Sequence, residues 1–108
     1  MIYVEYDRKK NNIKVKGHAQ SGDAGHDLVC AATTIIVYTL ASNVAQLSSD
    51  KSKVRRPIIN LGEGKAEIGC SPVHGMTAVV TLILDCICQG FDILAKQYPD
   101  NISYIVRG

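Results

Sequence analysis

Hydrophobic and polar residues alternate along the first part of the chain with the period of two that is typical of β-strands. Residues 1–7 place Ile2, Val4 and Tyr6 on one face, and the alternation returns over residues 12–17 after a polar turn at residues 8–11. This pattern predicts a β-hairpin. A second hairpin is predicted from residues 56–61 and 65–70, which flank the turn sequence Gly62-Glu63-Gly64.

A helical period replaces the alternation between the two hairpins. The stretch from Leu28 to Ser49 is 22 residues long and carries no charge, which is about the length that crosses a bilayer. Polar residues nevertheless recur along one side of a helix drawn over this stretch, opposite a continuous apolar side. The polar side holds Thr39, Ser42, Asn43 and Gln46, and the apolar side holds Val37, Leu40, Ala41, Val44 and Leu47. We therefore expect an amphipathic helix and no membrane span.

A second helix is predicted after the second hairpin. Ser71 followed by Pro72 is a typical N-cap and first helical position, and the helix should run to about Gln97, before Pro99. Residues 76–88 are apolar nearly all round, with Asp85 as the interruption. Such a helix is either buried between layers of a monomer or placed at a subunit interface, so full burial and a homodimer are both open. Residues 102–106 should form a last strand.

The predicted order is ββαββαβ, an α+β fold in which two long helices pack on one antiparallel or mixed sheet. The 108 residues form a single domain, 1–108, large enough to bury a core without a disulfide or a metal. No secretory signal pattern opens the chain, so we expect a cytoplasmic protein with reduced cysteines.

Composition and charge narrow the classes of partner. The net charge is only +2, and the basic residues gather in two predicted turns, which does not favour direct binding of nucleic acid. Cys86 and Cys88 would point apart on a helix, so no metal or other cofactor is expected. Cys70, Cys86 and Cys88 are predicted to be packing residues, since free cysteine is among the most buried residue types.

Candidate chemistry gathers between Gly17 and Thr34. Asp27 is placed to cap the first helix, which would put Cys30 in the first turn, where the helix dipole favours a thiolate. That dipole contributes about 0.3–1 kcal/mol, less than the roughly 1.4 kcal/mol of one pKa unit, so an imidazole partner is needed. His18 ends the second strand and is preferred over His26. Gly22 and Gly25 would leave the connecting loop free to close over a substrate.

These residues carry a resemblance to a known family. Gly17-His18-Ala19, Ser21-Gly22 and the run from Gly25 to Ala32 resemble the signature of the ribosomal-processing cysteine protease family, Prp, of bacteria and some phages. The resemblance implies Cys30 as nucleophile, His18 as general base and Asp27 as the acidic position, although Asp27 could instead be only a helix cap. The chain has Thr33-Thr34 where the family usually has Val-Ser, so Thr34 keeps a supporting hydroxyl. A substrate loop is implied at Gly17, Ala19, Ser21, Gly22 and Gly25.

The resemblance also implies a substrate. Members of the family remove a short N-terminal extension from large-subunit ribosomal protein twenty-seven, cutting after aromatic residues, and phage members are linked to capsid or scaffold processing. Two other functions stay open from the residues alone: a peptide-binding module without chemistry, and a dimeric structural protein. A protease predicts that Cys30 is alkylated much faster than the other three cysteines.

Overall fold

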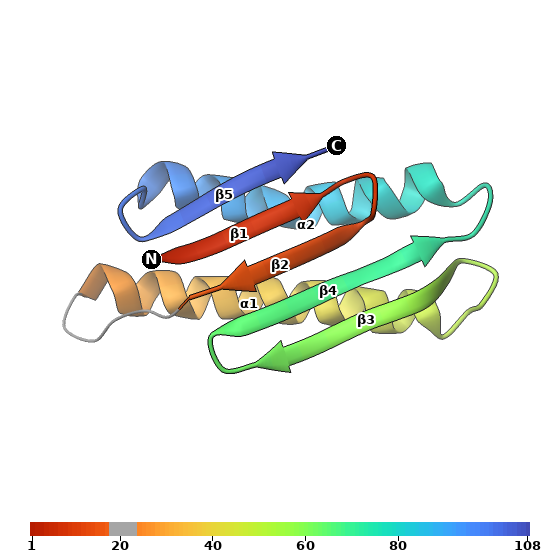
Figure 1. Ribbon diagram of the computed structural model, residues 1–108, viewed down its shortest axis with the longest axis horizontal. Coiled ribbons are helices and arrows are strands. Elements are labelled where there is room, and N and C mark those ends of the chain that lie inside the picture. The colour runs from red at the N-terminus through yellow and green to blue at the C-terminus, as the bar shows by residue number, and fades with distance from the viewer. Residues whose placement is uncertain (18–23) are drawn as a thin grey trace.

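The computed structural model describes residues 1–17 and 24–108, and for residues 24–27 it describes the backbone alone. Five strands and two helices follow one another in the predicted order, so the ββαββαβ prediction is confirmed (Figure 1). The elements are β1 (Ile2–Asp7), β2 (Asn12–Lys16), α1 (Ala24–Ser48), β3 (Val54–Gly62), β4 (Lys65–Pro72), α2 (Thr77–Gln97) and β5 (Ile102–Arg107).

The strands form one mixed sheet in the order β3-β4-β2-β1-β5. Both predicted hairpins are present, with Val4 opposite Val15 in the first and Ile59 opposite Ile68 in the second. β2 and β4 join the two hairpins in an antiparallel pair, and β5 lies parallel to β1 at the far edge. The sheet is therefore antiparallel except for its last pair.

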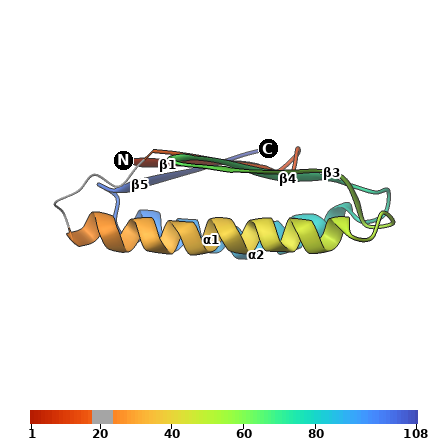
Figure 2. The same cartoon turned by 90° about the horizontal axis from the view of Figure 1, so that it is seen from below.

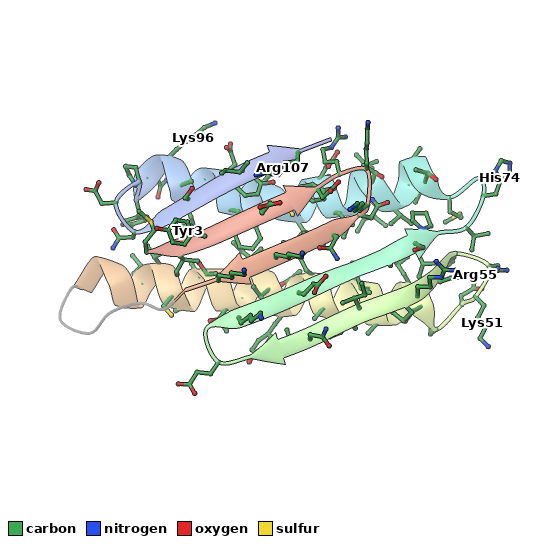
Figure 3. All side chains as sticks on the ribbon, viewed as in Figure 1. Tyr3, Lys51, Arg55, His74, Lys96 and Arg107 are labelled. Atoms are coloured by element: carbon green, nitrogen blue, oxygen red, sulfur yellow. The ribbon has the colours of Figure 1, made fainter. Side chains whose placement is uncertain are left out.

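Both helices cover the same face of the sheet (Figure 2). The strand residues that alternate inward, such as Val4, Tyr6 and Ile13, are buried beneath them. On α1, Val37, Leu40, Ala41 and Val44 are buried and Thr39 and Ser42 are exposed, which confirms the predicted amphipathic pattern. Tyr3 and Arg107 lie on the other face, which no helix covers (Figure 3).

The predicted helix starts are wrong at both helices. α1 begins at Ala24, so Asp27 lies within its first turn instead of capping it. Ser71 and Pro72 belong to β4, where they pair with Arg55 and Val54 of β3, and α2 begins only at Thr77. Ser71 and Pro72 do not start the helix because the hydrogen-bonded ladder between β3 and β4 extends through them. Pairing between strands here overrides the local preference of the sequence.

α2 buries only one of its two apolar sides. Val80, Leu84, Cys88, Phe91 and Leu94 are buried against the sheet, whereas Val79, Leu82 and Ile93 are exposed. Full burial of this helix in the monomer is therefore ruled out, and the expectation that Cys86 packs inside is wrong because its side chain is exposed. Cys70 and Cys88 are buried, as predicted.

Both helices are long and apolar enough to cross a membrane by length and composition. Each also packs along the sheet, and a core helix of a globular fold meets the same criteria. Asp85 fits this packed arrangement, since it accepts hydrogen bonds from Tyr6 Oη at 2.8 Å and from Arg8 Nη2 at 2.8 Å. The Asp85 side chain thus links α2 to β1 and to the turn after β1.

Candidate active site

A groove of about 460 Å³ lies between α1 and the sheet, at the end where β2 stops and β3 turns into β4. Three parts of the chain line it: the first half of α1, the ends of β1 and β2, and the β3–β4 turn. The lining residues are Ile2, Val15, Gly17, Cys30, Thr33, Thr34, Val37, Tyr38, Leu61, Gly62, Glu63, Gly64, Lys65 and Ala66. The groove is thus built by residues far apart in the sequence, and it includes the candidate nucleophile.

Cys30 is half-buried and lines this groove. It lies six positions after Ala24, the first residue of α1, so it is in the second turn and not the first. The dipole effect fades within the first turn, and the backbone N–H of a residue this far inside a helix is already paired. The backbone N–H groups around Cys30 are therefore not free to donate to a substrate oxygen. A Cys30 thiolate would depend all the more on a second partner such as an imidazole.

Gly17 brings the end of β2 to the same groove as Cys30. Its N–H donates a hydrogen bond to the carbonyl of Gly64 at 3.0 Å, which fixes the strand end against the β3–β4 turn. Its φ of 112° is in the region that favours glycine, and a Cβ there would overlap the carbonyl oxygen of Met1. The end of β2 and the second turn of α1 therefore meet at one groove.

The structure describes only some of the other predicted site residues. His18, Ala19, Ser21 and Gly22 lie outside the described residues, and their predicted roles stay predictions. Gly25 and Asp27 are in the first turn of α1, where the backbone alone is described.

Two threonines follow Cys30 along the groove, and they differ in their hydrogen bonding. The Thr34 hydroxyl is exposed and donates to the carbonyl oxygen of Cys30 at 2.8 Å, so it is tied to the backbone of the helical turn that carries Cys30. Thr33 is 5% exposed, and its Oγ1 is buried without a hydrogen-bond partner in the described part of the chain.

The β3–β4 turn forms the opposite wall, and sequence patterns did not predict this role. Leu61 is exposed there, and Glu63 and Lys65 place one acidic and one basic residue beside the groove. Tyr38 reaches the groove from α1 with its side chain more than half exposed. The turn sequence indicates only a tight hairpin, and nothing local shows that the hairpin lies alongside α1.

The remaining chemistry lies elsewhere. Lys51, Arg55 and His74 are at the other end of the molecule from the β3–β4 turn (Figure 3). Across residues 1–17 and 28–108, no group of three or more His, Cys, Asp or Glu side chains is arranged to hold a metal ion. Burial raises the pKa of the Cys70 thiol, and burial raises the pKa of Cys88 to about 12, which makes both poor nucleophiles near neutral pH.

Comparison with known proteins points to one family. The family model described as cysteine protease Prp matches residues 1–103. The ribosomal processing cysteine protease Prp of Staphylococcus aureus is 26% identical over 101 residues, which cover 94% of this chain and 91% of that protein.

Solved structures of the Staphylococcus aureus protein have a similar fold. One, the essential ribosomal processing protease Prp with a covalently linked product peptide, has a TM-score of 0.74 at 25% identity and covers 99% of this chain and 100% of that chain. A second, with a substrate peptide, has a TM-score of 0.75 at 24% identity over the same shares of both chains.

Proposed function

This chain belongs to the cysteine protease Prp family, and from that premise we propose that it uses Cys30 and His18 to remove a short N-terminal extension from large-subunit ribosomal protein twenty-seven. The observation that carries the proposal is the groove shared by Cys30 and Gly17. His18 follows Gly17 directly in the chain, and Gly17 lines the same groove as Cys30. The similar protein of Staphylococcus aureus has been solved with substrate and product peptides, which supports a peptide as partner.

The proposed reaction is acyl transfer. The Cys30 thiolate attacks the scissile carbonyl carbon, and His18 gives its proton to the departing amine as the C–N bond breaks. Water then attacks the thioester, His18 takes a proton from it, and the Cys30 thiolate leaves. No cofactor is needed for either step.

Thr34 and Asp27 have supporting roles in this proposal. The Thr34 hydroxyl holds the carbonyl of Cys30, which steadies the turn of α1 that carries the nucleophile. Asp27 lies in the first turn of α1 and acts by orienting His18, since the helix begins too early for it to be the cap. Gly17, Ala19, Ser21 and Gly22 meet the substrate in this proposal. Gly25 was expected in the same loop but lies in the first turn of α1, so it would meet the substrate from the helix.

A cleavage assay tests the proposal directly. A peptide that spans the extension junction of ribosomal protein twenty-seven is incubated with wild type, Cys30→Ser and His18→Ala, and the products are identified by mass spectrometry. Cutting by wild type alone is expected, because each substitution removes one half of the thiolate–imidazole pair. Cys86→Ala is the matched control, since that thiol is exposed on α2 and does not line the groove.

Two outcomes would contradict the proposal. Full cutting by folded Cys30→Ser would exclude Cys30 as the nucleophile. Peptide binding by the folded, reduced wild type without cutting would indicate a module that only binds. Cutting of a capsid or scaffold peptide in place of the ribosomal one would support the proposed Cys30–His18 pair and contradict the proposed substrate.

We also propose that the chain forms a homodimer through its helical layer. The outer side of α2 exposes Val79, Leu82 and Ile93, and α1 exposes Leu28 and Ile35. These residues lie on the side of the helices that faces away from the sheet layer, and a row of exposed apolar side chains on a soluble domain marks an interaction surface. A second copy offers the same surface, so two apolar faces can cover each other.

Sedimentation equilibrium of wild type, Leu82→Glu and Ile105→Glu tests the dimer. Leu82→Glu should give monomers, because it would bury an unpaired charge in the interface. Ile105→Glu should leave the dimer intact, since Ile105 is half-exposed on β5 and outside the helical layer. A monomeric wild type would refute the dimer, and binding of wild type to lipid vesicles would assign the face to a membrane.

We further propose that the protein is located in the cytoplasm and that it does not bind nucleic acid directly.

A further inference from the structure

We propose that Thr33 is a specificity-determining residue, whose hydroxyl forms a hydrogen bond with the polar tip of a substrate side chain inserted into the groove. This inference rests on the proposed function, because it takes the groove beside Cys30 as the place where the substrate binds.

The first step concerns an unmet hydrogen bond. Thr33 Oγ1 is buried and has no partner in the described part of the chain, although hydroxyls in protein interiors are nearly always paired. The other threonine hydroxyls of α1 show the usual solution, since Thr34 and Thr39 donate to the carbonyls of Cys30 and Ile35 at 2.8 and 2.7 Å. Thr33 alone among these three helical threonines leaves its hydroxyl unused.

The second step concerns what surrounds that hydroxyl. Thr33 lines the groove together with Ile2, Val15 and Val37, each of which is less than a tenth exposed. It is therefore one polar group in an apolar wall. Threonine has two accessible χ1 rotamers in a helix, so rotation about Cα–Cβ can turn the hydroxyl toward a group in the groove.

The third step concerns depth. Cys30 is half-buried and Thr34 is exposed, whereas Thr33 is 5% exposed. A substrate backbone that presents its carbonyl to the Cys30 sulfur passes along the rim, so what reaches Thr33 is a side chain. A charged tip would be costly to bury in this wall, and a neutral hydroxyl both donates and accepts. The fitting ligand is a side chain with an apolar body and a neutral polar tip, such as tyrosine.

The test uses two peptidyl chloromethyl ketones that are identical except for tyrosine or phenylalanine at the residue that carries the ketone. The Cys30 thiolate displaces chloride to form a thioether, and intact mass spectrometry follows the rate. All variants carry Cys86→Ala, so that the other exposed thiol does not react. Wild type should react about tenfold faster with the tyrosine probe, the effect of one additional hydrogen bond of about 1.4 kcal/mol.

Thr33→Val removes the hydroxyl and keeps the shape, so the ratio of the two rates should fall to about one. Thr33→Ser keeps the hydroxyl and should keep the preference. Thr39→Val is the matched control, because Thr39 is exposed and its hydroxyl is already bonded. The ratio compares two probes on one protein, so a change in folding alone does not move it.

Equal rates with wild type, or an unchanged ratio in Thr33→Val, would overturn the inference and leave the proposed protease intact. Failure of Cys30 to react with either probe in folded wild type would overturn the proposed function, and the inference with it.

Discussion

Thr33 in α1 and Asp85 in α2 are both polar residues within otherwise apolar stretches, and the structure treats them in opposite ways. Asp85 accepts hydrogen bonds from Tyr6 Oη, Arg8 Nε and Arg8 Nη2 at 2.8, 3.0 and 2.8 Å. Thr33 Oγ1 has no partner in the described part of the chain. A polar group that the fold itself satisfies contributes to stability, and one that the fold leaves unsatisfied is available to a ligand.

Each of these residues also has a cysteine close by in its helix. Cys88 lies near Asp85 and is buried, with a pKa raised to about 12, mainly by desolvation. Cys30, three positions before Thr33, borders the open groove. The region around Asp85 is therefore closed and its polar side chain is hydrogen-bonded. The region around Thr33 borders an open groove, and the Thr33 hydroxyl is not hydrogen-bonded in the described part of the chain.

Alkylation should show the largest difference between the two regions. Burial raises the pKa of Cys88 to about 12, which keeps this thiol protonated at neutral pH, and it also shields the sulfur from the reagent. Cys88 should therefore react more than a hundredfold more slowly than Cys30, about the factor that two pKa units would give. Iodoacetamide labelling of the folded protein, with peptide mapping over time, measures this ratio. Comparable rates for Cys88 and the exposed Cys86 would show that the Asp85 region opens readily.

Asp85→Ala should cause the next largest effect, a loss of about 2 kcal/mol in the free energy of unfolding, because the buried Tyr6 hydroxyl and the Arg8 guanidinium lose their acceptor. Urea unfolding measures it. Asp92→Ala is the control, since the Asp92–Lys96 pair is exposed on the same helix and should contribute only about 0.3–0.5 kcal/mol. Equal losses in the two variants would refute the view that Asp85 holds α2 to β1.

The Asp85 contribution should also depend on pH. Hydrogen bonds from Arg8 hold the pKa of this carboxyl below its ordinary value of 3.8. A group whose pKa is lower in the folded state stabilises the protein above its ordinary pKa, and this stabilisation is lost as the pH falls through the folded pKa. The difference in unfolding free energy between wild type and Asp85→Asn should therefore be constant above about pH 5 and shrink as the pH falls below the ordinary carboxyl pKa of 3.8. A difference that also stays constant below this pKa would exclude the charged interaction.

Thr33→Val should have the smallest effect on stability, and in the opposite direction. Replacing an unsatisfied buried hydroxyl by a methyl group should raise the free energy of unfolding by about 1 kcal/mol. Thermal and urea unfolding of the free protein measure the change. A loss of stability would mean that the hydroxyl is already satisfied, and the contrast with Asp85 would disappear.

The pattern of glycine, histidine and cysteine residues between Gly17 and Cys30 could be recognised in the sequence because all of these residues lie within one short stretch of the chain. The sequence pairs Cys30 with His18, and the structure places Gly17, the residue before His18, at the same groove as Cys30. The start of α1 was placed too late, because the Asp27 cap signal is shared by residues inside a first turn. The groove wall from the β3–β4 turn had no sequence signal, since it depends on which hairpin lies beside α1.

The sequence by itself determined the element order, the apolar faces that form the core and the candidate nucleophile, because periodicity and residue chemistry are properties of neighbouring positions. Only the tertiary structure decided that Cys86 is exposed while Cys88 is buried, that Asp85 is paired, and that Thr33 is left unpaired in a groove. These outcomes depend on which strands and turns lie against each helix. Burial and hydrogen bonding are set by contacts between segments far apart in the chain, and no local pattern contains them.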